Sequence, residues 1–256
     1  MGGLRCGTCW HSPLTSHCVH TVSRKYPYNA SVTDDLDKRE FGILVPFERW
    51  MGRAALPFVP ATISPNQITL VGGFCGVLAG LAFYLASFGK AWFPVAGLMV
   101  FLHWALDNID GHVARSRNET SKAGRFLDIF LDGITWAAIG IGVGFASYAH
   151  LSIVAVATIL VVLQYVLGML WIALTRIWPF PAFGPAEGSL SLILLALLMA
   201  YLPGESFTVW GIQFSLMDLF YAAMIPTSMI WLFTSALQLF RHLQMEDAAD
   251  ASHLAR

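Results

Sequence analysis

Four aspartates and one arginine stand at the junction of two long apolar segments of this sequence. Asp107 and Asp110 lie near the end of the first segment, Asp128 and Asp132 lie near the start of the second, and Arg115 lies between the two pairs. An ionised side chain inside a bilayer costs several kcal/mol unless a partner compensates its charge. A group of charges at this place therefore indicates a functional site.

The spacing of the four aspartates predicts that their side chains converge. Asp107 and Asp110 are three residues apart and Asp128 and Asp132 are four apart, so each pair shares one face of a helix. In an antiparallel helical hairpin with its midpoint near Glu119, Asp107 comes level with Asp132 and Asp110 with Asp128. Bare carboxylates at one depth repel each other. With hard divalent cations between them, they form the oxygen-rich site that Mg²⁺ or Mn²⁺ prefers.

The complete motif extends beyond the aspartates. The run Asp107-x2-Asp110-Gly111-x2-Ala114-Arg115-x8-Gly124-x3-Asp128-x3-Asp132 resembles the signature of the class I CDP-alcohol phosphotransferases, the membrane enzymes that build phospholipid head groups. Every fixed position is matched. The resemblance implies a transferase that moves a substituted phosphate group from a CDP-linked donor to an alcohol acceptor and releases CMP.

The resemblance also assigns roles to the aspartates. It implies that Asp107, Asp110, Asp128 and Asp132 are metal ligands, with Asp132 at the second ion and also the general base of catalysis. Two divalent ions held about 3.5 to 4 Å apart can clamp both the attacking and the leaving oxygen of a phosphoryl transfer. We therefore expect two ions, either Mg²⁺ or Mn²⁺, as cofactors.

The smaller residues and the arginine of the motif are expected to bind the CDP group. Gly111 and Gly124 allow the nucleotide to approach the helix backbone closely, because a side chain would hold it several ångströms away. Ala114 is a small residue of the same kind beneath the cytidine. Arg115 offers a guanidinium fork suited to phosphate oxygens, the alternative being an anchor at the membrane surface.

Other polar residues near the motif are weaker candidates. Lys122 and Arg125 lie where an anionic substrate would enter, and the alternative for both is membrane anchoring. Glu187 begins the fifth apolar segment on the same predicted side, where it could contact the acceptor alcohol or a phosphate. His103 and His112 flank the motif, but the signature requires neither, and packing or head-group contact is the expected role.

Composition predicts a polytopic membrane protein. The chain has 256 residues, of which 56% are hydrophobic and only 12% charged, against about 25% charged in soluble domains. Its formal net charge is -1, and no basic tract suggests a nucleic-acid partner. Apolar segments of about 20 residues suffice to span a bilayer. Such segments occupy 66–88, 93–116, 121–148, 151–175, 188–203 and 215–240.

These segments predict an all-α integral membrane fold of six transmembrane helices. Gly72, Gly76 and Gly80 recur every four residues on the first span and predict close approach of a neighbouring helix. Ser64 and Pro65 supply an N-cap and a first-turn proline for the same span.

The rest of the chain divides by composition. We expect a polar arm at 1–40, an amphipathic helix in the membrane interface at 41–60, the six-helix phosphotransferase domain at 61–241 and a polar tail at 242–256. In the second segment, apolar residues such as Phe47 and Trp50 recur at helical spacing against Glu48, Arg49 and Arg53.

Cysteine and histidine residues gather within the arm, and their spacing fits no zinc finger well. They either hold zinc or remain reduced thiols in an unstructured segment. They are Cys6, Cys9, His11, His17, Cys18 and His20.

The distribution of basic residues predicts the orientation in the membrane. Lys90 is the only lysine or arginine on one side of the six predicted spans, whereas basic residues gather on the other side at 24–53 and 115–125. By the positive-inside rule, both termini and the aspartate hairpin are cytoplasmic.

The identities of donor and acceptor stay open at this level. Six spans and modest length favour a donor of the CDP-diacylglycerol type. The alternative is an aminoalcohol phosphotransferase that uses CDP-choline or CDP-ethanolamine, because residues 184–188 are similar to a Gly-Pro-x-Glu-Gly segment of that branch. A membrane cation transporter is a remote alternative, since it leaves the glycines and the arginine of the motif without a role. The family resemblance also implies a homodimer.

Overall fold

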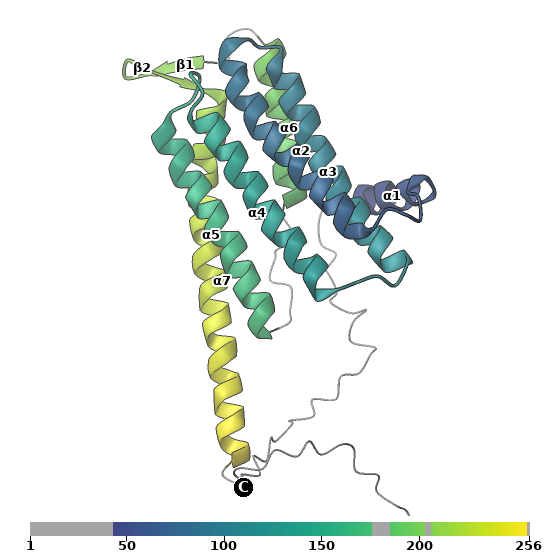
Figure 1. The fold of residues 1–256 in the computed structure, drawn as a ribbon. Coiled ribbons are helices and arrows are strands. Elements are labelled where there is room, and N and C mark those ends of the chain that lie inside the picture. The colour runs from purple at the N-terminus through teal and green to yellow at the C-terminus, as the bar shows by residue number, and fades with distance from the viewer. Residues whose placement is uncertain (1–42, 176–184, 203–205, 255–256) are drawn as a thin grey trace, which may run out of the picture. The chain divides into compact units, whose positions relative to one another are not determined.

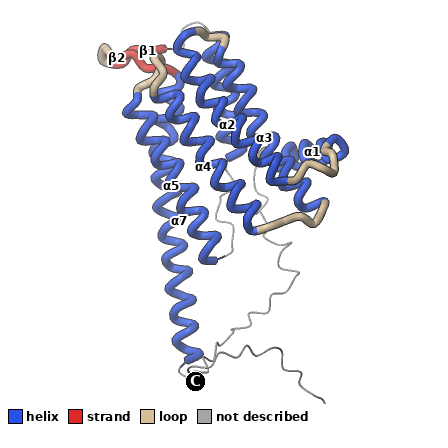
Figure 2. Tube along the Cα trace, in the orientation of Figure 1, coloured by secondary structure: helices blue, strands red, loops and turns tan. Residues whose placement is uncertain are grey.

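The computed structural model describes residues 43–175, 185–202 and 206–254, and they are mainly helical (Figures 1 and 2). The polar arm with its cysteine and histidine residues lies outside the described residues. The elements in chain order are α1 (Val45–Ala55), the short helix η2 (Leu56–Phe58), α2 (Pro65–Leu85), the short helix η3 (Ala86–Phe88), α3 (Trp92–Ser116), α4 (Lys122–Gly144), α5 (Leu151–Thr175), α6 (Pro185–Tyr201), the strands β1 (Ser206–Val209) and β2 (Ile212–Ser215), and α7 (Leu216–Leu254).

Four helical stretches among the described residues are long and apolar enough to cross a membrane. They are Pro65–Phe88, Lys122–Gly144, Leu151–Thr175 and Leu216–Ala248, and the apolar part of α6, Ala186–Tyr201, is shorter. Large apolar side chains such as Phe74, Ile159 and Phe233 are exposed on these stretches, as expected for surfaces that face lipid. The protein is therefore an integral membrane protein, and the six-span arrangement stays a prediction.

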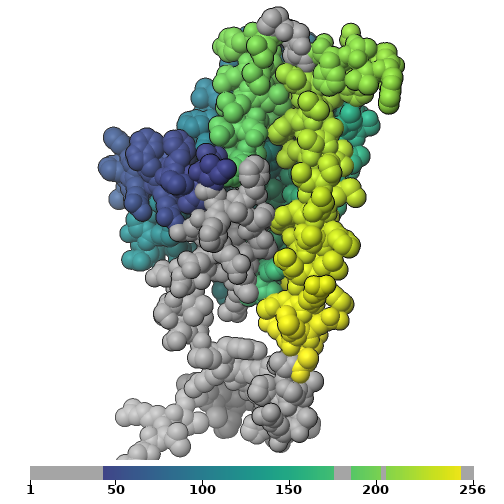
Figure 3. Space-filling model, turned by 180° about the vertical axis from the view of Figure 1, so that it is seen from behind, coloured from purple at the N-terminus to yellow at the C-terminus, as the bar shows by residue number. Residues whose placement is uncertain are grey.

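The helices pack in a connected series. Helix α2 packs against α3 and α4, α4 packs against α5, α5 against α7, and α3 against α6 (Figure 1). From behind, α6 in green lies beside the start of α7 in yellow (Figure 3). The predicted glycine surface of α2 explains the α2–α4 contact, because a Cβ atom on Gly76 would overlap Thr135 and one on Gly80 would overlap the Ala138 carbonyl.

Side-chain caps mark the start of two helices near the site, α2 and α4. Ser64 is the N-cap of α2 and Pro65 lies in its first turn, as predicted. Gln67 completes a capping box, in which Ser64 Oγ accepts from the Gln67 N–H at 3.3 Å. Ser121 caps α4 by accepting from the Gly124 N–H at 2.9 Å. In the turn between α3 and α4, Asn118 adopts a left-handed conformation with φ of 55°. The two helices do not form a packed hairpin, because α2 packs against both of them.

Helix α1 packs across α3 near the aspartates. Glu48 Oε1 accepts from Trp104 Nε1 at 2.9 Å and from Asn108 Nδ2 at 3.4 Å. On the outer side, Trp50 is 64% exposed. This distribution of polar contacts and exposed aromatic surface is compatible with the predicted interfacial position, which stays a prediction.

A β-hairpin modifies the all-α prediction. β1 and β2 pair antiparallel with Val209 opposite Ile212, and the two turn residues, Trp210 and Gly211, have φ of 50° and 81°. Two consecutive positive φ angles are the mark of a type I′ turn. Helix α7 then continues to Leu254, well beyond the predicted end at 240.

The apolar core lies near the hairpin. It includes Phe83, Ile139, Leu192, Met199 and Met217, none of which is more than 1% exposed. Figure 1 shows the hairpin at the upper end of the helices, whereas the α3–α4 turn lies at the opposite end. A second, smaller apolar cluster, of Ile129, Val161 and Tyr165, joins α4 and α5 beside the aspartates of the motif.

Candidate metal centre and active site

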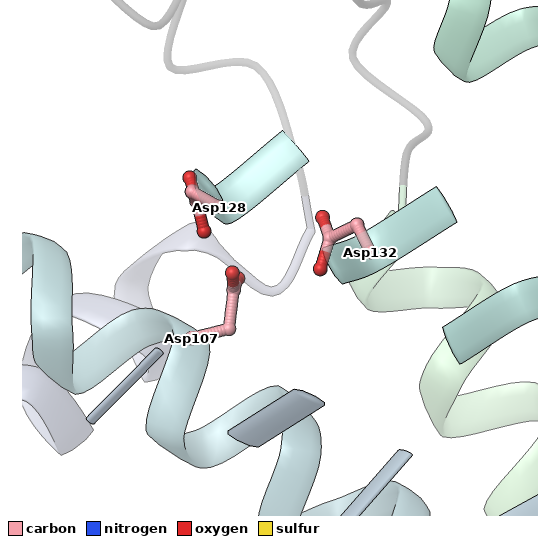
Figure 4. A group of neighbouring side chains, drawn as sticks. All are labelled: Asp107, Asp128 and Asp132. Carbon is pink, nitrogen blue, oxygen red and sulfur yellow. The ribbon is translucent and has the colours of Figure 1, made fainter. Parts of the chain in front are cut away.

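Three aspartates from two helices meet at one point. Asp107 projects from α3, and Asp128 and Asp132 project from α4 toward it (Figure 4). One carboxylate oxygen from each lies within 4.8 Å of the other two, and all three residues are half-buried. We call these three residues the aspartate cluster.

The aspartate cluster has the donor set of a site for a hard cation. Asp128 Oδ1 is buried and accepts no hydrogen bond from the described residues. A buried polar atom without a partner costs about 1–3 kcal/mol, and more when it is charged. A divalent cation would supply the missing partner and would offset the repulsion among the three carboxylates. The residues present therefore fit Mg²⁺ or Mn²⁺.

The structure brings three of the four predicted carboxylates within 4.8 Å of one another, and the place of Asp110 in the metal site stays a prediction. The Asp110 side chain is buried and accepts a short hydrogen bond from Thr69 Oγ1 on α2. Asp110 lies nearly one turn beyond Asp107 on α3. The Thr69 hydroxyl on α2 orients the Asp110 carboxylate at this position. Asp107, and not Asp110, is the residue of α3 that approaches both Asp128 and Asp132.

A cleft of about 160 Å³ opens beside the aspartate cluster and connects it with Asp110. The residues that line it are Pro65, Asn66, Thr69, Asp107, Asp110, Gly111, Ala114, Arg115, Glu119, Thr120, Ser121, Gly124, Arg125 and Asp128. Three of the four predicted metal ligands and all four predicted CDP contacts are among them. The cleft is therefore built by the motif on α3 and α4 together with the first turns of α2.

Two glycines of the motif keep the cleft open. A Cβ atom on Gly124 would lie 3.0 Å from Asn66 Oδ1 and 3.1 Å from Ser121 Oγ. A Cβ atom on Gly111 would lie 3.2 Å from Nη1 of Arg115. All three distances are tighter than ordinary contact, so larger residues here would displace the polar side chains that line the cleft.

The basic residues near the cleft separate into two groups. Arg115 and Arg125 line it, and Arg115 is exposed. Arg117 instead donates to backbone carbonyls of the segment between α1 and α2, with Nη1 2.7 Å from Ile63 O and Nη2 3.0 Å from Val59 O. Arg117 thus ties that segment to the end of α3, a structural role.

Two candidates from the sequence lie elsewhere. Lys122, the first residue of α4, is exposed and is not among the residues that line the cleft. Glu187 is buried in the first turn of α6, and the adjacent Gly188 lies against Trp136 of α4, one turn beyond Asp132. Glu187 does not line the cleft either.

Sequence reasoning missed the contribution of α2. Asn66 and Thr69 lie in the first two turns of this helix and line the cleft. Their only signal in the sequence is their place directly after the Ser64 cap. No motif connects them with Asp110, more than 40 residues later, because their proximity depends on how α2 packs against α3.

The sequence profile of the CDP-alcohol phosphatidyltransferase family matches residues 62–237. The chain therefore belongs to the CDP-alcohol phosphatidyltransferase family, whose members are membrane transferases of phosphate-containing groups in phospholipid biosynthesis.

Individual relatives match part of the chain. The chain is 40% identical over 80 residues to inner membrane protein YnjF of Escherichia coli, covering 31% of this chain and 36% of that protein. It is 36% identical over 81 residues to the archaetidylinositol phosphate synthase of Pyrococcus horikoshii, covering 32% of this chain and 40% of that protein. The matches thus span less than half the length of these curated relatives.

Solved structures of one enzyme share the fold. The phosphatidylinositol phosphate synthase of Mycobacterium tuberculosis with CDP-DAG bound has a TM-score of 0.56 at 15% identity, covering 76% of this chain and 94% of that chain. The same enzyme in complex with manganese and citrate has a TM-score of 0.57 at 15% identity, covering 75% and 88% of the two chains. At this identity, the likeness shows the fold alone.

Proposed function

We propose that this protein is a phospholipid-synthesising CDP-alcohol phosphotransferase with a donor of the CDP-diacylglycerol type. The reaction transfers the phosphatidyl group to the hydroxyl of an alcohol acceptor and releases CMP. The single observation that carries the proposal is the aspartate cluster beside a cleft lined by the small residues and the arginine of the motif. The names of the relatives favour this donor, because a neighbour of the same fold was solved with CDP-DAG bound.

We assign the metal ligands to the aspartates of α3 and α4. Asp107, Asp128 and Asp132 are near enough to share ions, and Asp110 on the wall of the same cleft completes the set of four. The structural neighbour in complex with manganese supports a divalent metal. Two ions, when bound, would neutralise the pyrophosphate and stabilise the leaving oxygen of CMP.

We assign the CDP group to the open part of the cleft. Gly111, Ala114 and Gly124 leave room for the nucleotide against the helix backbones. Arg115 then faces the phosphates with a guanidinium that can donate two hydrogen bonds. Arg125, on the same wall, adds positive charge at the cleft, and Lys122 lies on the approach to it.

Asp132 is the proposed general base. Its side chain is 18% exposed, and it lies on the inner side of the aspartate cluster, within reach of the other two carboxylates. Polarisation of the acceptor hydroxyl by a cation lets a weak base take the proton as the bond to phosphorus forms. Glu187 lies one helix away, near Trp136, and is the proposed contact of the acceptor from that side.

The distribution of apolar and charged residues supports the proposed domain boundaries and the proposed orientation in the membrane. Residues 61–241 form the catalytic domain with six spans, residues 41–60 form a helix in the membrane interface, and residues 1–40 and 242–256 are polar arm and tail. The aspartate end and both termini face the cytoplasm, where soluble nucleotides and acceptors are found. The functional unit is a homodimer, as the family resemblance implies.

The test is CMP release by the purified protein in lipid nanodiscs. We expect release with labelled CDP-diacylglycerol, a strict requirement for Mg²⁺ or Mn²⁺, and much lower release with CDP-ethanolamine. The variants Asp128→Ala and Asp132→Asn should be inactive. Asp247→Asn, on the exposed end of α7, is the matched control and should be unchanged. Full activity in both cluster variants would contradict the assignment, and a preference for CDP-ethanolamine would favour the aminoalcohol branch.

A further inference from the structure

A buried histidine connects the aspartate cluster to a third helix. His103 lies on α3, one turn before Asp107, and is 6% exposed. Its Nδ1 lies 3.2 Å from the carbonyl oxygen of Gly72 on α2. Its Nε2 lies 3.5 Å from Oδ1 of Asp132 on α4. One imidazole ring therefore contacts polar atoms of both neighbouring helices.

The ring of His103 lies in closely packed surroundings. The space between His103, Gly72, Leu131 and the aspartate cluster is a void of about 10 Å³, at the lower end of the about 10–15 Å³ that one water molecule needs. The α2–α3 contact is also tight, because a Cβ atom on Gly72 would lie 3.3 Å from Leu106 Cβ. The ring is therefore the main polar group that the described residues place on this side of Asp132.

We propose that His103 is a positioning residue of the reaction, which holds the carboxylate of Asp132 in the orientation that catalysis and metal binding require. This inference rests on the function proposed above for Asp132. A carboxylate rotates freely about its last bond unless a neighbour fixes it, and partners that hydrogen-bond metal ligands typically contribute about 10–100-fold to metal affinity or activity. His103 is suited to this role because the backbone of α2 fixes its other nitrogen.

The contacts also distinguish this role from packing alone. A histidine that only fills space would be replaceable by an apolar residue of similar size. Here both ring nitrogens lie within 3.5 Å of an oxygen atom on a different helix, a backbone carbonyl on α2 and a carboxylate on α4. Both oxygens accept, and a neutral imidazole carries one N–H, so the ring donates to both only as the imidazolium. The position of Nε2 relative to Asp132 is thus the feature to test.

Three substitutions at His103 test the contacts of the two ring nitrogens separately. In His103→Gln, the side-chain amide reaches about as far as Nε2 and can restore the contact with Asp132. In His103→Asn, the amide reaches about as far as Nδ1 and can restore only the contact with Gly72. His103→Leu removes both contacts and keeps an apolar side chain. His242→Gln, on the α7 extension beside Glu246, is the matched control.

We expect the three variants to differ in kcat but not in KM. We expect His103→Leu and His103→Asn to lower kcat by about 10–100-fold, with KM for the CDP donor changed by less than about 3-fold, and His103→Gln to recover most of kcat. Electron paramagnetic resonance with Mn²⁺ alone should show affinity weakened about 10-fold in the first two variants and near the wild-type value in His103→Gln.

Two outcomes would overturn the inference. Wild-type kcat and Mn²⁺ affinity in His103→Leu would show that the ring does not act on Asp132. Equal losses in all three variants, together with equally lowered thermal stability, would show a packing role only. If the wild-type protein released no CMP from either donor, the proposed function would fail, while the Mn²⁺ affinities would still decide the role of His103.

Discussion

Two aspartates at opposite ends of this protein show how one residue type can stabilise a fold or prepare a reaction. Asp218, near the hairpin, is 2% exposed and accepts hydrogen bonds from the backbone N–H of His150 at 2.7 Å and of Ser215 at 2.9 Å. Its second oxygen also lies 3.0 Å from Nδ1 of His150. Asp128, at the other end, has a buried oxygen that accepts no hydrogen bond from the described residues.

The surroundings of the two carboxylates differ. Around Asp218, the turn between α4 and α5 and the last residue of β2 present N–H groups, so its negative charge ties these segments to α7. Around Asp128, the neighbours include the other two carboxylates of the aspartate cluster, and their proximity disfavours ionisation of all three until a cation binds. The hairpin end is therefore organised for stability, and the aspartate end keeps an unfavourable arrangement that suits function.

The largest expected effect is on activity, in Asp128→Ala. CMP release should fall by more than about 100-fold, since even indirect partners of metal ligands contribute about 10–100-fold. Without added metal, the melting temperature should stay equal or rise, because the substitution removes repulsion within the aspartate cluster. Assays of CMP release and thermal unfolding with and without Mn²⁺ measure both effects. A marked loss of stability in Asp128→Ala without metal would contradict the contrast drawn between Asp128 and Asp218.

Asp218→Ala should show the opposite profile. The substitution leaves the N–H groups of His150 and Ser215 without their acceptor, and each buried donor without a partner costs about 1–3 kcal/mol. For a chain of this size, we expect the melting temperature to fall by about 5 °C or more, at about 2–4 °C per kcal/mol. The rate of CMP release per folded molecule, measured well below the transition, should stay within about 3-fold of wild type. Inactivity of the folded variant would contradict this separation of roles.

A smaller effect is expected in Thr69→Val. This change keeps the shape of the side chain and removes the hydroxyl that donates to Asp110, so the carboxylate loses the contact that orients it. We expect kcat to fall by about 10-fold. Thr69→Ser keeps the hydroxyl and is the paired control, which should retain most of the activity. Equal kcat in both variants would show that the α2 contact does not matter for the reaction.

The smallest effect is expected in Gly124→Ala. The added methyl group would lie 3.0 Å from Asn66 Oδ1 at the wall of the cleft, so it should raise KM for the CDP donor by a few fold with little change in kcat. Gly89→Ala is the matched control, because nothing lies within 4 Å of a Cβ atom at that position. A larger effect at Gly89 than at Gly124 would contradict the assignment of the cleft to the nucleotide.

The sequence by itself determined the helices that carry the site and most of its residues. The segments predicted at 93–116 and 151–175 agree within one residue with α3 and α5, because apolar runs and their polar limits are local properties of the chain. The capping box at Ser64 followed from adjacent residues in the same way. The cleft residues Gly111, Ala114, Arg115 and Gly124 were found because the motif places them on two consecutive helices joined by a short turn.

Only the tertiary structure decided which polar groups meet. The rotation of each helix about its axis, set by contacts such as that between Gly76 and Thr135, determines whether a carboxylate turns toward a partner or away from it. This rotation separated Asp110 from the aspartate cluster and placed Thr69 and His103 against carboxylates. Such pairings depend on packing between segments far apart in the chain, which periodicity and spacing do not encode.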